Sequence, residues 1–174
     1  MHRRQPLPHL WLMTDERQGD ALWRAVERLP RGSGIIFRHY SLGPVERRRL
    51  FERLRRTARR KGLTLLVAGP RALARAWRGD GSHGRHPGAV TAPVHDLREL
   101  KAAERAGARL LFVSPVYATR SHAAKQPLGR IGFGMLVRQA RAPVIALGGL
   151  DQARARSLAG FGVYGWAAID AWSA

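Results

Sequence analysis

Two apolar segments of this chain each run into residues that could hold a phosphate group. One is followed by Thr119 and Ser121, whose hydroxyls can donate hydrogen bonds, and the other ends in Gly148 and Gly149. Consecutive glycines let backbone N–H groups approach an anion closely. If the two segments are neighbouring strands, these four residues meet at one end of a sheet and form a phosphate site. The alternative is that Gly148-Gly149 is only a turn and residues 119–121 only an exposed loop.

The order of apolar and amphipathic segments predicts strands that alternate with helices. The expected strands are residues 10–14, 34–40, 64–68, 82–83, 89–95, 109–116, 143–148 and 163–169. The expected helices are residues 20–29, 44–61, 71–77, 97–106, 131–141 and 152–159. This alternation predicts an α/β fold of the closed (β/α)₈ TIM-barrel type, in which functional groups lie at the C-terminal ends of the strands. An open doubly wound sheet is the alternative.

The chain length of 174 residues is short for such a barrel, which usually needs about 200 residues or more. No helix fits between residues 83 and 89, and none follows the eighth strand. We therefore expect a trimmed barrel, with short or missing helices after strands four and eight, formed by residues 1–174 as a single domain. Missing outer helices would leave apolar barrel surface exposed, which a second copy could cover, so a homodimer is expected.

The charge balance is strongly basic, with a formal net charge of +19 at pH 7. A basic surface attracts polyanions without recognising their sequence. However, the basic residues are spread along the chain, and their densest group, residues 46–61, alternates with apolar residues at helical spacing, as in a solvated helix face. No helix-turn-helix, zinc-finger or aromatic RNA-binding pattern accompanies them, so nucleic acid is not the expected partner.

Two absences exclude further classes of protein. The sequence contains no cysteine, which rules out disulfides, thiolate metal ligands and a thiol nucleophile. No apolar run reaches the roughly 18 residues that span a bilayer, and the first residues show no signal-peptide cleavage pattern. We therefore expect a cytoplasmic protein without a membrane partner.

The strand-end segments resemble, in the same order, those of the thiamine phosphate synthase and thiazole tautomerase (TenI-type) superfamily, of which this chain looks like a divergent member. The resemblance covers nearly the whole chain and is carried by residues 10–15, 34–38, 81–83, 113–119, 143–149 and 165–169. It implies a (β/α)₈ barrel and a role in thiamine biosynthesis. Synthases of this family join a pyrimidine diphosphate to a thiazole phosphate, using magnesium and releasing pyrophosphate.

Several positions match the anion-binding residues of the family. Arg38 matches an arginine that faces the diphosphate, and Thr119 and Ser121 match hydroxyls that hold the thiazole phosphate. Gly148 falls in the glycine pair, completed by Gly149, that binds the same phosphate through its backbone. The resemblance therefore implies a phosphorylated small molecule as the ligand.

Other positions depart from the family pattern. Ile36 and Tyr40 replace a glutamine and a lysine, and Gly69 replaces a magnesium-binding aspartate. The second such aspartate has no counterpart beyond residues 84–86, and His122 replaces a lysine after the sixth strand. Mg²⁺ is the cofactor that the family implies, but because its ligands are not retained we expect no metal site.

No catalytic residue is assigned, and the candidates are Arg38, His95 and His122. Arg38, Arg71 or Arg85 could act as an electrostatic clamp on a departing diphosphate in place of the metal. His95 either donates to a backbone carbonyl or does acid–base work, and His122 is either a ligand contact or a plain loop residue.

Two more substitutions bear on the site. Pro115 occupies the position of the acid–base histidine of the tautomerases. Asp170 replaces a small residue at the end of the eighth strand, where its carboxylate would repel a phosphate unless it points away or pairs with an arginine. Three hypotheses therefore remain: a synthase-type transferase, an inactive or regulatory homologue that binds a phosphorylated ligand, and a polyanion-binding or RNA-binding protein.

Overall fold

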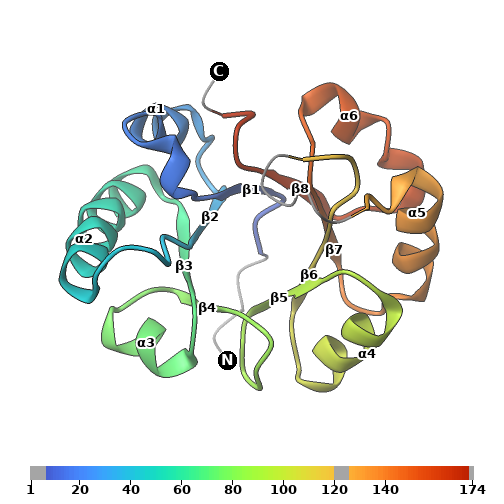
Figure 1. Ribbon diagram of the computed structural model, residues 1–174, viewed down its shortest axis with the longest axis horizontal. Helices are drawn as coiled ribbons and strands as arrows, with labels where there is room; N and C mark the ends of the chain where they lie inside the picture. The colour runs from blue at the N-terminus through green and yellow to red at the C-terminus, as the bar shows by residue number, and fades with distance from the viewer. Residues whose placement is uncertain (1–6, 120–125, 173–174) are drawn as a thin grey trace.

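The computed structural model describes residues 7–119 and 126–172, whose eight parallel strands close into a barrel in chain order (Figure 1). The last strand pairs with the first, with Leu12 opposite Ala168. This confirms the predicted (β/α)₈ barrel, and the open-sheet alternative is wrong. The strands are β1 (Leu10–Met13), β2 (Gly34–Phe37), β3 (Thr64–Ala68), β4 (Gly81–His83), β5 (Thr91–Val94), β6 (Leu110–Val113), β7 (Val144–Leu147) and β8 (Gly165–Ala168).

Helices surround the barrel in Figure 1 and are α1 (Ala21–Arg28), α2 (Pro44–Lys61), α3 (Arg71–Ala76), α4 (Leu97–Arg105), α5 (Gly129–Gln139) and α6 (Gln152–Arg156). The described residues also form two short 3₁₀ turns, η1 (Glu16–Gln18) and η3 (Ala159–Phe161). Residues 84–90, all of them described, contain no helix, and neither do the described residues after β8. The barrel is therefore trimmed at the two expected places. Within the described residues, no helix is long and apolar enough to cross a membrane.

The strands are apolar on both faces because the barrel interior and the helical layer each bury one face. Trp11, Ile36 and Phe112 belong to the cluster that fills the interior, and the Trp11 and Phe112 rings meet edge to face at 5.4 Å. Leu12 and Ile35, on the opposite faces of their strands, pack with the residues of α1 and α2. The alternation along each strand therefore separates the barrel interior from the outer layer.

Two strands, β2 and β6, end three residues earlier than expected, and local hydrogen bonding explains both. The backbone N–H of Arg38 donates to Thr14 Oγ1 at 2.9 Å, and His39 has a φ of 37°, so the chain leaves β2 at Phe37. At β6 the Ser114 N–H still donates to Val94, but Pro115 has no N–H to continue the ladder. Both departures turn the chain across the C-terminal end of the barrel.

The outer face of β8 is covered by one side chain in place of a helix. The Trp172 ring stacks on Trp166 with centroids 5.0 Å apart and packs against the cluster that contains α1. On α5, Ile131 and Met135 are exposed. The homodimer stays a prediction.

Candidate functional site

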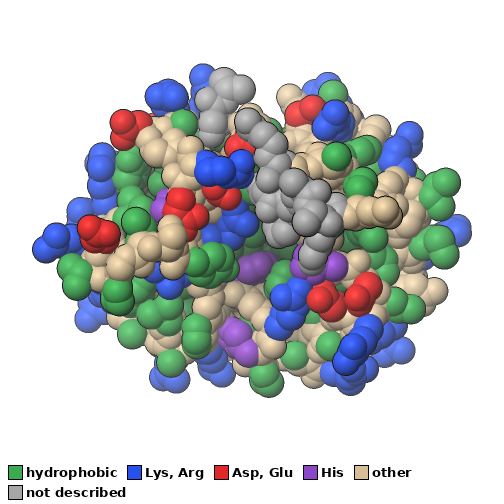
Figure 2. Space-filling model, viewed as in Figure 1, with side chains coloured by type: hydrophobic (Ala, Val, Ile, Leu, Met, Phe, Trp, Pro, Cys, Tyr) green, Lys and Arg blue, Asp and Glu red, His purple; other side chains and the backbone are tan. Residues whose placement is uncertain are grey.

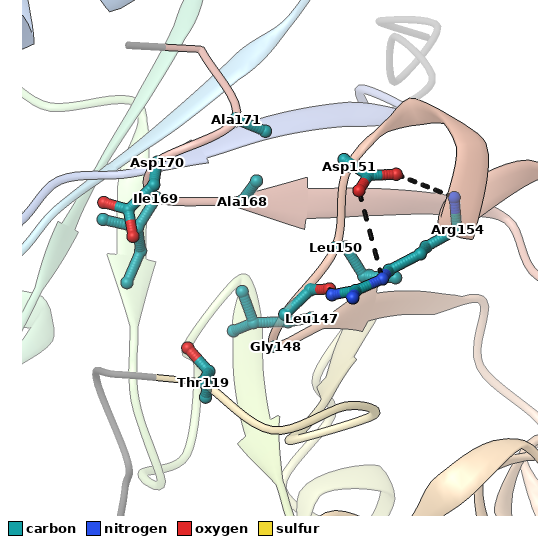
Figure 3. Close-up of a pocket in the computed structure, with 11 residues that line it drawn as sticks. Thr119, Leu147, Gly148, Leu150, Asp151, Arg154, Ala168, Ile169, Asp170 and Ala171 are labelled. Carbon is teal, nitrogen blue, oxygen red and sulfur yellow. Dashed lines mark hydrogen bonds and ion pairs between the residues drawn. The ribbon is translucent and has the colours of Figure 1, made fainter. Parts of the chain in front are cut away.

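A cavity of about 290 Å³ lies at the C-terminal ends of β6, β7 and β8 (Figure 3). We call it the β6–β8 cavity. Thr119 contributes from the segment after β6, and Gly148 and Gly149 follow β7 directly. Its lining residues are Thr119, Leu147, Gly148, Gly149, Leu150, Asp151, Arg154, Ala168, Ile169, Asp170 and Ala171. Thr119, Gly148 and Gly149, three of the four residues expected to hold a phosphate, therefore share one cavity.

Gly148 and Gly149 have φ values of 101° and 62°, a conformation that favours glycine. The segment after β6 packs on this turn, because Val116 N–H donates to Leu147 at 2.9 Å and Tyr117 N–H to Gly148 at 3.0 Å. Within the described residues, the N–H groups of Gly149 and Leu150 have no hydrogen-bond acceptor. Two backbone donors therefore remain beside the Thr119 hydroxyl.

The charged residues of the β6–β8 cavity largely neutralise one another. Asp151 accepts a hydrogen bond from the Arg154 backbone at 2.8 Å, and its carboxylate lies 4.0 Å from Arg154 Nε (Figure 3). Arg154 Nη1 donates to the Gly149 carbonyl at 2.6 Å. Arg17 has a raised pKa, mainly through its hydrogen bond to Asp15 and also through the charges of Asp15 and Asp170. Arg17 is therefore close enough to interact with the charge of Asp170. This is the arginine partner that a carboxylate beside a phosphate site was expected to need.

A second cavity, of about 470 Å³, lies at the ends of the first five strands and reaches β6 and β7; we call it the central cavity. Leu147 lines both cavities. No aspartate or glutamate lines this one, and Figure 2 shows histidines near the middle of this face with lysine or arginine side chains beside them. Its lining residues are Met13, Arg38, Tyr40, Gly69, Pro70, His83, Gly84, Arg85, His86, Pro93, His95, Phe112, Ser114 and Leu147.

Arg38 is held at the rim of the barrel by groups that follow β1. Its Nε donates to the Thr14 carbonyl at 2.7 Å, and its Nη2 forms an ion pair with Asp15 at 2.9 Å. Burial lowers the pKa of Arg38, and the charge of Asp15 opposes this effect. Arg71, also considered as a clamp, lines neither cavity.

His95 has a carboxylate partner at its Nδ1 atom. Its Nδ1 lies 2.7 Å from Glu99, and Arg85 Nη2 lies 3.1 Å from both oxygens of the same carboxylate. Burial opposes ionisation of Glu99, but hydrogen bonds from His95 and Arg85 outweigh it and lower the Glu99 pKa. Glu99 was not predicted as a site residue, although its spacing from Asp96 is that of a helix cap. Its carboxylate folds back and accepts a hydrogen bond from the His95 N–H, just after the end of β5.

His83 is buried at the end of β4, where its Nδ1 lies 2.8 Å from Thr91 Oγ1. Burial lowers its pKa to about 3, so the imidazole is neutral at pH 7. The contact with Thr91 joins β4 to β5, which is a structural role. Ser121 and His122 lie outside the described residues.

The residues at the expected magnesium positions do not fit that ion. The Gly69 carbonyl lies 3.0 Å from His86 Nε2, and residue 85 is an arginine. Magnesium prefers carboxylate and phosphate oxygens. Within residues 7–119 and 126–172, no group of three His, Cys, Asp or Glu side chains could hold a metal ion.

These observations define a (β/α)₈-barrel protein with two adjoining cavities at the C-terminal ends of its strands. The family model described as thiamine monophosphate synthase matches residues 10–172, so the chain belongs to that family.

A curated relative and a solved structure agree with this membership, and a second solved structure shares the fold. A relative from Aquifex aeolicus (strain VF5), provisionally named thiamine-phosphate synthase 2, is 28% identical over 180 residues, covering 94% of this chain and 97% of that protein. The solved thiamine phosphate pyrophosphorylase from Pyrococcus furiosus is 25% identical, with a TM-score of 0.80 over 97% of this chain and 88% of its own. A thiamine phosphate pyrophosphorylase structure from Bacteroides thetaiotaomicron, 18% identical with a TM-score of 0.63, covers 93% and 83% and shares the fold.

Proposed function

We propose that this protein acts in thiamine biosynthesis by binding a phosphorylated thiazole-type ligand, with the phosphate in the β6–β8 cavity. One observation carries this proposal: Thr119 and Gly149, from the ends of different strands, line the same cavity. The Thr119 hydroxyl and the Gly149 and Leu150 N–H groups supply donors without bringing charge. Such donors suit a phosphate at the seventh and eighth strands of a (β/α)₈ barrel.

A second candidate function is the coupling of that ligand to a pyrimidine diphosphate. The specific observation in its favour is that the central cavity adjoins the β6–β8 cavity at Leu147, so two ligands can lie side by side. In this reaction the thiazole nitrogen attacks the pyrimidine methylene carbon, and the carbon–oxygen bond to the diphosphate breaks with the electron pair leaving on oxygen. The inactive ligand-binding homologue is the alternative.

Calorimetry with thiazole phosphate tests the binding proposal. Thr119→Val keeps the shape of the side chain and removes the hydroxyl, so we expect roughly tenfold weaker binding, the loss of one hydrogen bond to a charged group. Thr64→Val, at the opposite end of the barrel on β3, is the matched control and should bind like the wild type. Absence of heat with the wild-type protein would reject the proposal.

Product formation then separates the two candidates. Thiamine phosphate formed from both substrates, measured with magnesium and with a chelator, would support coupling. Thiazole phosphate binding without product would support the ligand-binding homologue. The cytoplasmic location stays a prediction.

A further inference from the structure

The central cavity has the donors of an oxyanion site but lacks the acceptors of a metal site. Arg38, Arg85, His86 and His95 line it together with the Ser114 hydroxyl, and none of the fourteen lining residues is acidic. Its volume of about 470 Å³ falls in the range of small-ligand sites. An anionic group can enter this cavity without meeting a carboxylate in its wall.

Arg85 is both anchored and incompletely bonded. Its Nη2 lies 3.1 Å from each oxygen of Glu99 and 2.9 Å from His95 Nδ1, which anchors this one nitrogen of the guanidinium. In the described part of the chain, Nε and Nη1 of Arg85 have no acceptor, and the side chain is 53% exposed. A guanidinium anchored at Nη2 can offer its other N–H groups to a phosphate and loses less conformational freedom than an unanchored side chain would.

Other basic side chains also line the central cavity. Arg38 is paired with Asp15 through Nη2 and has no acceptor at Nη1 among the described residues. His83 is neutral because burial lowers its pKa to about 3. His86 Nε2 is engaged with the Gly69 carbonyl. Arg85 and Arg38 are the two arginines that line this cavity.

We propose that the central cavity binds a phosphate or diphosphate group through side chains alone, with Arg85 as the principal cation and without a divalent metal ion. The cavity lining offers a Mg²⁺ ion no protein carboxylate and includes two arginines that would repel it. The inference rests on the proposed function only in placing a second anionic ligand beside the first. It predicts that magnesium does not strengthen binding, because free magnesium competes with the arginines for the same oxygens.

Calorimetry with inorganic pyrophosphate tests this inference on the full chain, once with EDTA and once with millimolar magnesium chloride. We expect binding in EDTA that is at least as tight as binding in magnesium. Arg85→Gln should weaken it about tenfold or more, which corresponds to the loss of a charge-assisted contact. Arg98→Gln removes an exposed arginine from α4, the helix that carries Glu99, and should leave the affinity unchanged.

Arg85→Lys provides a second variant if the glutamine variant does not fold. Lysine retains the positive charge but lacks the planar set of N–H donors of the guanidinium. We therefore expect an affinity between those of the wild type and Arg85→Gln. Circular dichroism and thermal unfolding check that each variant is folded. Binding that requires magnesium, or an Arg85→Gln affinity equal to that of the wild type, would overturn the inference.

Thr119→Val distinguishes failure here from failure of the proposed function. Pyrophosphate binding that is lost in Thr119→Val but kept in Arg85→Gln would place the anion in the β6–β8 cavity and overturn the inference. No pyrophosphate binding in EDTA would also overturn it. Neither result affects the thiazole phosphate titration, which tests the proposed function separately.

Discussion

Gly149 lies against the backbone of Ala118, so closely that a Cβ atom at residue 149 would be 2.5 Å from the Ala118 carbonyl oxygen. Residue 118 precedes Thr119 in the segment after β6, and residue 149 follows β7. This contact brings the two strand ends together and sets the hydroxyl of Thr119 and the N–H of Gly149 on one cavity. The site therefore depends on a backbone approach that a side chain would prevent.

Gly149→Ala should lower the free energy of unfolding by about 2–4 kcal/mol, because the new Cβ meets a backbone atom and the residue keeps a positive φ. Gly160→Ala is the matched control, since a Cβ there meets nothing within 4 Å. Its expected effect is within about 0.5 kcal/mol. Urea unfolding monitored by fluorescence measures both, and equal stability of the two variants would contradict the close approach.

Asp170→Asn should strengthen phosphate binding in the β6–β8 cavity by about threefold to tenfold. The change removes a negative charge from the lining and keeps the side-chain size, and a screened charge near a partly exposed site contributes about 1 kcal/mol. Calorimetry at low and moderate salt measures the affinity. The gain should shrink as salt screens the charge, and a loss of affinity would mean that the carboxylate supports the ligand.

His83 should make the protein less stable as the pH falls from 6.5 toward about 3. Burial lowers the folded-state pKa to about 3, so in this range the unfolded chain binds a proton that the native imidazole does not. The contribution is present above pH 6.5 and is lost on acidification, with a slope of at most about 1.4 kcal/mol per pH unit. Unfolding free energies of the wild type and His83→Gln, compared across this range, measure the difference; parallel curves would contradict the buried neutral state.

Trp172→Ala should lower the free energy of unfolding by about 2–4 kcal/mol, because it uncovers Trp166 on the outer face of β8. Trp172→Phe is the control. It retains an aromatic ring and removes a buried Nε1–H that has no partner among the described residues, so its cost should be small. If thermal and urea unfolding gave both variants equal losses, Trp172 would not act through ring packing.

The sequence predicted the barrel because strand and helix patterns are local. Each of the eight strands was found near its expected residues, and the missing helices after β4 and β8 followed from spacing alone. The ends of β2 and β6 were less predictable. They depend on a side chain from another strand, Thr14, and on the interruption of a ladder at Pro115.

The two cavities were likewise predictable from the sequence only in part. The sequence by itself determined which residues could donate to an anion, since hydroxyls, glycines and arginines are recognisable by type, and it placed Thr119 and Gly149 at strand ends. Only the tertiary structure decided that the Glu99 carboxylate contacts both Arg85 and His95. It also decided that Leu147 lines two adjoining cavities. The physical reason is that closing the barrel sets the direction of each side chain, and residues distant in the chain meet only after all eight strands are paired.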